Sequence, residues 1–321
     1  MKTIPGLALV GEDLVQVEQR MREAPHENIE PLITAIDTIL NSGGKRVRPA
    51  LALLTNRFYR PTEDKVISLA AAVEMLHTAT LVHDDLIDNA LLRRGNPTLN
   101  AIWSPGATVL TGDFLFAWAA NLAAQTEHMR VMSIFSRTLM VICSGEIRQL
   151  FQRFWREQTH QDYERRIFAK TASLFAAATE AAAVLASAPE PEVGALRDYG
   201  HQLGMAFQIV DDVLDFVGSS REMGKPVGSD MRQGIVTLPI LYYLDLHPDD
   251  ELLTRIFEGH ADNGVVEAAV AHIRQAGAVD AALDDARFYV QRAQAALTGF
   301  PANGYRQAML DLADFVVQRR V

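Results

Sequence analysis

The feature that most constrains the fold is a helical spacing of apolar residues that runs through almost the whole chain. Five long segments show it, at residues 66–92, 100–125, 131–155, 163–188 and 193–217. Several are apolar nearly all round, which is typical of helices surrounded by other helices or lining an apolar cavity. No run has the alternation expected of a strand. The sequence therefore predicts an all-α fold.

The rest of the chain fits the same plan. Shorter and more polar segments follow at about residues 231–245, 249–259, 263–276, 279–298 and 302–320. We expect these to be helices around the outside of a core. Because no linker and no low-complexity segment interrupts the pattern, we expect one domain over residues 1–321.

Composition narrows the function classes. The net charge of −10 argues against nucleic acid as a partner. Cys143 is the only cysteine, so no internal disulfide can form, and a reducing cytoplasm is the expected location. The N-terminus is too short and too soon acidic for a signal peptide. No apolar run is expected to be long enough for a transmembrane segment.

Two clusters of aspartates interrupt the apolar segments. Asp84, Asp85 and Asp88 stand at i, i+1 and i+4, and the spacing recurs at Asp211, Asp212 and Asp215. Like charges four residues apart repel on one helix face, and carboxylates among apolar residues are costly unless paired or metal-bound. One cluster alone could be a solvated acidic face, but two between apolar flanks favour cation sites. Ligands that are all oxygen favour Mg²⁺.

Cations that could bind phosphate lie near both clusters. The stretch SGGKRVRPAL, residues 42–51, places two glycines before Lys45 and Arg48 at a helix start, which suits a phosphate. Arg46 is expected to be a solvated surface arginine. His77 shares a helix face with Asp84, whereas His83 is expected to pack in the core. The remaining candidates are Arg93, Arg94, Lys170 and Lys225. Each has an ordinary structural explanation, but together they suit two diphosphate groups.

These motifs resemble those of the trans-isoprenyl diphosphate synthase (polyprenyl synthetase) family. The matching pieces, in family order, are GGKRVRP at 43–49, EMLHTATLVHDDLID at 74–88, RRGNPT at 93–98, KTA at 170–172, FQIVDDVLDF at 207–216 and GKPVGSD at 224–230. The C-terminal YRQAMLDLADFVVQRR looks like the last helix of long-chain members. The resemblance implies an isoprenoid synthase fold of long helices around a deep central cavity, usually as a homodimer.

The resemblance also implies an activity and a set of roles. Such enzymes condense an allylic diphosphate primer with isopentenyl diphosphate in repeated 1'-4 elongation to an all-trans polyprenyl diphosphate. Asp84 and Asp88 would bind Mg²⁺ with support from Asp85, and Asp211 would bind a further Mg²⁺. The allylic diphosphate would contact Arg93, Lys170, Thr171, Gln208 and Lys225. Isopentenyl diphosphate would contact Lys45, Arg48, His77 and Arg94. The residues expected to act in catalysis are Asp84, Asp85, Asp88, Arg93, Lys170, Asp211 and Lys225.

Two positions depart from the family pattern. Ile235 stands where many members carry a lysine that contacts the allylic diphosphate, so one cation is missing. Asn89 stands where an acidic residue is frequent, and we expect this change to matter less.

Product length should depend on residues below Asp84 on the same helix. In the resembled family, aromatic residues at the positions of Ala79 and Thr80 stop the chain at fifteen carbons, and both are small here. The next obstacles would be Leu76 and Val73, with Phe116 and Met140 as candidates for a floor. We therefore expect a product longer than C20, in the C30–C50 range. Geranylgeranyl diphosphate synthase is the alternative, and a terpene cyclase or a non-catalytic partner subunit fits less well.

Overall fold

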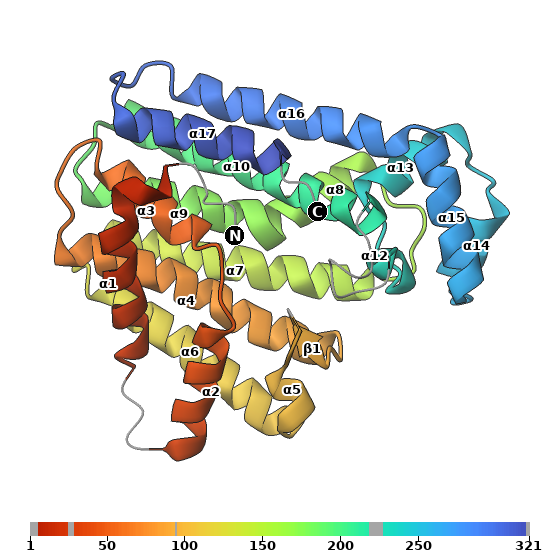
Figure 1. Ribbon diagram of the computed structural model, residues 1–321, viewed down its shortest axis with the longest axis horizontal. Helices are drawn as coiled ribbons and strands as arrows, with labels where there is room; N and C mark the ends of the chain where they lie inside the picture. Colours follow the sequence, from red (N-terminus) through yellow and green to blue (C-terminus); the bar gives the residue numbers. More distant parts are fainter. Residues whose placement is uncertain (1–5, 25–28, 94, 218–226, 319–321) are drawn as a thin grey trace. The chain divides into compact units, whose positions relative to one another are not determined.

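The computed structural model describes residues 6–24, 29–93, 95–217 and 227–318. Within these ranges the chain is helical almost throughout (Figure 1). The strands of this described part are β1 (Leu92–Arg93) and β2 (Asn96–Pro97), which pair antiparallel with Arg93 opposite Asn96. The all-α prediction is confirmed.

The helices follow the predicted order. In the first half of the chain they are η1 (Leu7–Val10), α1 (Gly11–Arg22), α2 (Glu30–Asn41), α3 (Val47–Asn56), α4 (Asp64–Ile87), α5 (Leu99–Ile102), α6 (Pro105–Ala124) and α7 (Met129–Phe151). In the second half they are α8 (His160–Ile167), η2 (Phe168–Ala172), α9 (Ser173–Leu185), α10 (Glu190–Val217), α12 (Ser229–Arg232), α13 (Leu238–Leu246), α14 (Glu251–Phe257), α15 (Asn263–Gln275), α16 (Ala278–Ala296) and α17 (Gly304–Gln318).

Helix α4 ends five residues earlier than the predicted segment 66–92. Asn89 takes a left-handed backbone conformation with φ 50°, which ends a helix and which asparagine tolerates better than most residues. The Ala90 N–H donates to the Asp85 carbonyl at 2.8 Å, and the Asn89 N–H donates to the Leu86 carbonyl at 3.2 Å. These two bonds form the Schellman pattern that closes a helix C-terminus. The chain then turns back through the β1–β2 hairpin, so Arg93 lies outside the helix.

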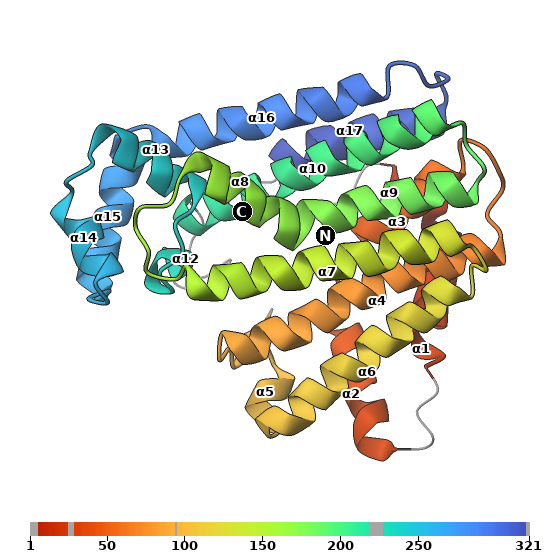
Figure 2. The same cartoon turned by 180° about the vertical axis from the view of Figure 1, so that it is seen from behind.

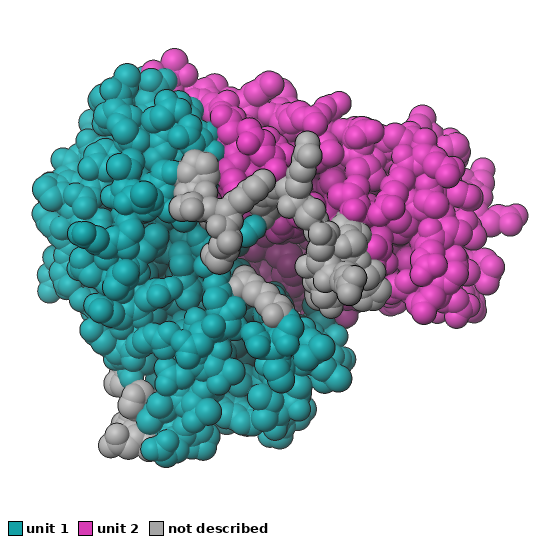
Figure 3. All heavy atoms as spheres, viewed as in Figure 1, with its two compact units in different colours: residues 1–137, 177–197, 299–312 teal, residues 138–176, 198–298, 313–321 magenta. Residues whose placement is uncertain are grey.

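The chain divides into two compact units, each assembled from separate stretches of sequence (Figure 3). Unit 1 comprises residues 1–137, 177–197 and 299–312, and unit 2 comprises residues 138–176, 198–298 and 313–321. The first aspartate cluster belongs to unit 1 and the second to unit 2. A single domain and a central cavity stay predictions.

Helix α4 is the core of unit 1. It packs against α6, α3 and α1, and residues 66–76 are buried on every face of the helix. Its neighbour α6 runs antiparallel, because Ser68 donates a hydrogen bond to Gln125 near one end and His83 packs against Gly112 near the other. This packing explains why the α4 sequence is apolar nearly all round.

In unit 2 a π-helical turn, η2, separates α8 from α9 in one continuous helical run. Two glycines from neighbouring helices pack closely against this turn. Gly145 of α7 meets Ala169, and a Cβ on Gly204 of α10 would lie 2.5 Å from the Ala172 Cα. Helix α15 packs against α14, α16 and α13, and α13 also packs against α16 (Figure 2). The close approach fixes the turn that carries Lys170 and Thr171.

We expected no apolar segment to be long enough to span a membrane, and this expectation is wrong when helices are judged by length and composition alone. Three described helical runs are long and apolar enough: residues 64–87, 105–124 and 160–185. Within the protein, 78% of the apolar window in α4 and 89% of that in residues 160–185 is buried, against 44% in α6. Packing against other helices accounts for most of this apolar surface.

Candidate active site

The three carboxylates of the first aspartate cluster differ in exposure and in their contacts. The Asp88 N–H donates to the Asp84 carbonyl at 2.8 Å, so these two residues stack one turn apart. Asp84 is half-buried and Asp88 exposed, whereas Asp85 is only 7% exposed. The Arg93 guanidinium covers Asp85, with Nε 2.9 Å and 3.0 Å from the two carboxylate oxygens and Nη2 2.8 Å from Oδ1. The hairpin after α4 thus supplies the counter-charge for the buried member.

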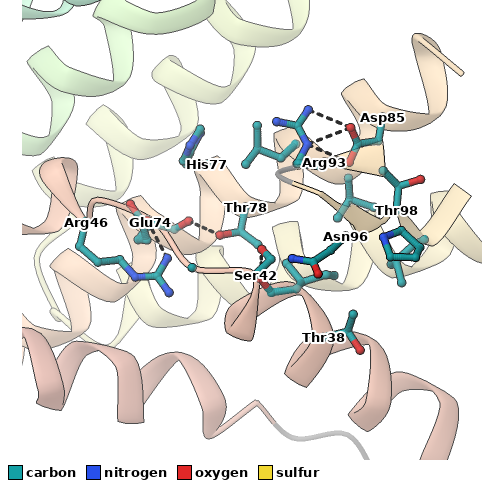
Figure 4. Close-up of a pocket in the computed structure, with 17 residues that line it drawn as sticks. Thr38, Ser42, Arg46, Glu74, His77, Thr78, Asp85, Arg93, Asn96 and Thr98 are labelled. Carbon is teal, nitrogen blue, oxygen red and sulfur yellow. Dashed lines mark hydrogen bonds and ion pairs between the residues drawn. The ribbon is translucent and has the colours of Figure 1, made fainter. Parts of the chain in front are cut away.

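A pocket in unit 1 lies beside this cluster (Figure 4). The empty space in the pocket and in its opening to solvent is together about 760 Å³. The lining includes Gly43 and Gly44 of the glycine loop, His77, Asp85 and Arg93. The structure therefore brings together the glycine loop, the histidine and the arginine that the sequence placed in three separate motifs.

The sequence suggested that Arg46 is a solvated surface residue, and the structure shows that this prediction is wrong. Its side chain is 13% exposed and lines the same pocket. Nη1 lies 3.0 Å from Glu74 Oε1, and Nε lies 3.0 Å from Glu18 Oε1. Sequence reasoning missed Glu74, although a single carboxylate amid an apolar helix signals a buried counter-charge. Lys45 is exposed and Arg48 half-buried.

The second cluster, in unit 2, also buries its middle aspartate. The Asp212 carboxylate accepts a hydrogen bond from the Tyr163 hydroxyl at 2.9 Å and another from Gln208 Nε2 at 2.7 Å. Gln208 Oε1 in turn accepts from the Thr171 hydroxyl at 2.5 Å. These bonds connect α10 to both α8 and the π-helical turn. Tyr163 was not identified from the sequence.

Burial and the nearby charge of Asp230 together raise the pKa of Asp212 to about 7. Arg166 and the hydrogen bonds from Gln208 and Tyr163 act in the opposite direction. Burial and the neighbouring Asp212 raise the pKa of the Tyr163 hydroxyl well above its usual value. The tyrosine therefore keeps its proton and remains a donor.

Asp215 closes the start of a short helix. Its two carboxylate oxygens accept from the Ser229 N–H at 3.0 Å and the Asp230 N–H at 3.1 Å, at the first turn of α12. Gly228 precedes that turn with φ 73° and has no side chain to cap it. Asp215 thus performs the capping. Asp211 is half-buried beside this network.

Lys170 lies in the π-helical turn, a geometry that is frequent at functional sites. Its Nζ is 2.9 Å from Glu146 Oε1 of α7, and both side chains keep some exposure. The turn therefore holds a lysine next to a threonine that reaches Gln208. Glu146 was not identified from the sequence, where it is one of many acidic residues.

Two candidate cations, Arg94 and Lys225, lie outside the described residues. Among the residues that are described, no group of three or more His, Cys, Asp or Glu side chains is close enough to hold a metal ion. Asp84 and Asp88 nevertheless suit Mg²⁺, which is usually held by one or two carboxylates together with waters and substrate phosphates. The half-buried Asp211 offers one more oxygen ligand of the same kind.

Comparison with known proteins identifies the family. Residues 29–273 match Polyprenyl synthetase. Heptaprenyl diphosphate synthase component 2 of Geobacillus stearothermophilus is 38% identical over 321 residues, covering 99% of each chain. The chain belongs to the polyprenyl synthetase family. The crystal structure of a decaprenyl diphosphate synthase from Rhodobacter capsulatus is 38% identical, with a TM-score of 0.91 over 98% of each chain.

A polyprenyl synthase from Caulobacter crescentus, complexed with calcium and isoprenyl diphosphate, is also 38% identical, with a TM-score of 0.92 over the full length of both chains. The predicted family, the isoprenoid synthase fold and a prenyltransferase function of the long-chain type are confirmed.

Ile235, the position at which we expected many family members to carry a lysine, has other cations beside it. Ile235 lines a small pocket with Arg153 and Arg166. Arg166 is buried, donates to the Val236 carbonyl at 2.7 Å and lies over the Tyr163 ring at 5.2 Å from its centroid. Unit 2 therefore carries positive charge next to the substituted position, which the sequence did not reveal.

The residues expected to set the length of the product differ in how much of their surface is exposed. Ala79 and Leu76 have no exposed surface and Val73 is also buried, whereas Thr80 is half-buried and donates to the His77 carbonyl at 2.7 Å. Their role stays a prediction. The ring of Phe116 packs on His83, with centroids 5.2 Å apart, next to Asp84 rather than Val73. This contact does not support the expected role of Phe116 as a floor, and Met140 is exposed on α7.

Tyr163→Phe tests the support of the second cluster. The change leaves one oxygen of a buried carboxylate without its donor, so unfolding free energy should fall by about 1–3 kcal/mol. Chemical denaturation measures this loss. Tyr242→Phe is the matched control, because its hydroxyl donates to Asp285 at 2.7 Å between half-buried residues, and it should cost less than about 1 kcal/mol. Equal losses in both variants would contradict a special role for Tyr163.

Proposed function

We propose that this chain is an Mg²⁺-dependent trans-prenyltransferase that extends an allylic diphosphate with isopentenyl diphosphate by repeated 1'-4 condensation to an all-trans polyprenyl diphosphate. The observation that carries this proposal is the pocket of unit 1. There the glycine loop, His77 and Arg93 lie beside the first aspartate cluster. Membership of the polyprenyl synthetase family supports it.

The cations would divide between two diphosphate groups. Lys45, Arg48 and His77, together with Arg94, would bind isopentenyl diphosphate, since a glycine loop at a helix start offers N–H groups and positive charge. The allylic diphosphate would contact Arg93, Lys170, Thr171, Gln208 and Lys225. In Arg93 the guanidinium already makes a bidentate contact with a carboxylate, the geometry that also suits phosphate.

The carboxylates would hold the metal. Asp84 and Asp88 would bind Mg²⁺ of the allylic diphosphate, and Asp211 would bind a further ion. Bound Mg²⁺ would neutralise charge on the leaving diphosphate and so favour ionisation of the allylic C–O bond. Isopentenyl diphosphate would then attack the allylic carbon through its double bond, and the resulting cation would lose a proton to the released diphosphate. Apolar surroundings would protect the cation from water.

The product is proposed to be longer than C20. The heptaprenyl and decaprenyl relatives reported above, both 38% identical to this chain, are named for products of seven and ten isoprene units, within the C30–C50 range expected from the sequence. Small residues at positions 79 and 80 agree with this length. We place the enzyme in the cytoplasm, in keeping with a single cysteine that is exposed and unable to form an internal disulfide.

We propose a homodimer, because exposed apolar side chains recur on one face of α7. Met140, Ile147 and Phe151 are exposed at intervals of seven and four residues, and Phe151 is 87% exposed. Light scattering should give about twice the 35.5 kDa chain mass. Ile147→Asp should shift the protein toward monomer, whereas Leu246→Asp, at an exposed leucine of α13, should not. A monomeric wild type would contradict the dimer.

The metal proposal predicts a large loss of turnover in Asp84→Ala and Asp211→Ala. Removing a group that stabilises developing negative charge usually costs about 10²–10³ in rate. The assay uses the purified chain alone with radiolabelled isopentenyl diphosphate, farnesyl diphosphate and Mg²⁺. Unchanged circular dichroism is the control for folding. Full activity in excess EDTA would exclude the metal role, and an inactive wild type that turns over only with a second subunit would exclude homomeric function.

Thr80→Phe should shorten the product, because a half-buried position can hold a ring that enters the path of the growing chain. Ala79→Phe should overpack instead, since Ala79 has no exposed surface. Thr80→Val, which keeps the size and branching of the side chain and replaces the hydroxyl by a methyl group, is the control. Chromatography of the products measures their length. A C15 product from the wild type, or an unchanged product from active Thr80→Phe, would refute this account.

A further inference from the structure

One largely buried ion pair in the lining of the unit 1 pocket has no role in the chemistry proposed above. Arg46 places Nη1 3.0 Å from Glu74, Nε 3.0 Å from Glu18 and Nη2 3.3 Å from the Leu40 carbonyl. These partners belong to α4, α1 and α2, so a single guanidinium joins three helices. Glu74 is 4% exposed, which makes it the most deeply buried of the three contacts and the costliest to leave without a partner.

The backbone of Arg46 is equally specific. Its φ of 49° is left-handed, a conformation that L-residues other than glycine rarely adopt. Arg46 is the residue before α3, and its carbonyl accepts the Ala50 N–H at 3.1 Å. The side-chain contacts therefore hold the strained residue at which the glycine loop turns into α3. Lys45 immediately precedes it, and Arg48 lies two residues after it.

Glu74 connects this loop to the histidine of the same pocket. Glu74 and His77 are three residues apart on α4, a spacing that puts them on neighbouring parts of one helix face. The Thr78 hydroxyl donates to the Glu74 carbonyl at 2.8 Å, and both Thr78 and His77 line the pocket with Arg46 (Figure 4). The ion pair thus fixes the distance between the glycine loop and the helix that carries His77.

We infer that Arg46 and Glu74 are positioning residues for the diphosphate of isopentenyl diphosphate. Their ion pair holds the loop of Gly43, Gly44 and Lys45 against α4 in the geometry that binds the diphosphate. This inference rests on the proposed function of the same pocket. A buried ion pair is weak evidence for stability alone, since apolar replacements are often as stable. Placement of the loop gives the pair a reason to be charged.

Arg46→Met, Glu74→Gln and the double variant separate placement from stability. In all three the KM for isopentenyl diphosphate should rise at least about tenfold, since a loop displaced by about 1 Å weakens every contact it makes. The KM for farnesyl diphosphate should stay within about twofold. Each single variant leaves one buried charge without its partner, whereas the double variant removes both charges. The double variant should therefore regain much of the lost melting temperature but not the lost affinity.

Arg57→Met is the matched control. Arg57 follows the other end of α3, and its Nη2 lies 3.0 Å from the buried Asp13 of α1, so the pair also joins α3 to α1. Neither Arg57 nor Asp13 lines the pocket. Arg57→Met should lower the melting temperature and leave both KM values unchanged. Arg46→Lys keeps the charge but not the three-way fork, so its KM for isopentenyl diphosphate should lie between those of wild type and Arg46→Met.

Calorimetric titration with isopentenyl diphosphate gives a second readout that does not need turnover. The inference is overturned if Arg46→Met binds isopentenyl diphosphate as tightly as wild type, if both KM values rise together, or if the double variant regains affinity as it regains stability. Failure of the proposed function looks different. A wild type that binds isopentenyl diphosphate without prenyl transfer refutes the reaction, while weaker binding by Arg46→Met still supports the positioning role.

Discussion

Carboxylates that are buried in helices without water must each meet a donor from another element, and much of the described structure depends on this requirement. Glu74 meets Arg46, Asp85 meets Arg93, and Asp212 meets Tyr163 and Gln208. In each case one donor, Arg46, Arg93 or Tyr163, comes from a different element, whereas Gln208 lies four residues before Asp212 on the same helix. Because an unpaired buried charge costs several kcal/mol, these contacts specify where the partner segment lies.

The first two aspartates of each cluster differ in burial in the same way. Their middle members, Asp85 and Asp212, are buried and bonded within the protein, whereas Asp84 and Asp211 remain half-buried. The repeated i, i+1, i+4 spacing thus places one carboxylate inward and leaves its neighbour accessible. The inward residue orients the helix end and the hairpin or network around it. The half-buried residue is the one that we propose as a ligand of a metal ion.

Close backbone approach places the lysine and threonine of the KTA motif. Gly145 and Gly204 allow α7 and α10 to press on a π-helical turn, where any side chain would collide with Ala169 or Ala172. The turn directs Lys170 toward Glu146 and Thr171 toward Gln208. A polyprenyl synthetase motif that reads as three adjacent letters therefore depends on two glycines, respectively 25 residues before Lys170 and 34 after it.

The sequence by itself determined the helical fold, the family and the aspartates, because apolar spacing and motif order are local properties that need no knowledge of contacts. It also located the loop, the histidine and the arginine that line the unit 1 pocket. Only the tertiary structure decided the state of Arg46, which depends on Glu18 and Glu74 from other helices. The same holds for the arginines beside Ile235 and for Tyr163 on Asp212. The end of α4 at Ile87 rather than Leu92 was decided by a left-handed asparagine, a backbone state that apolar periodicity does not encode.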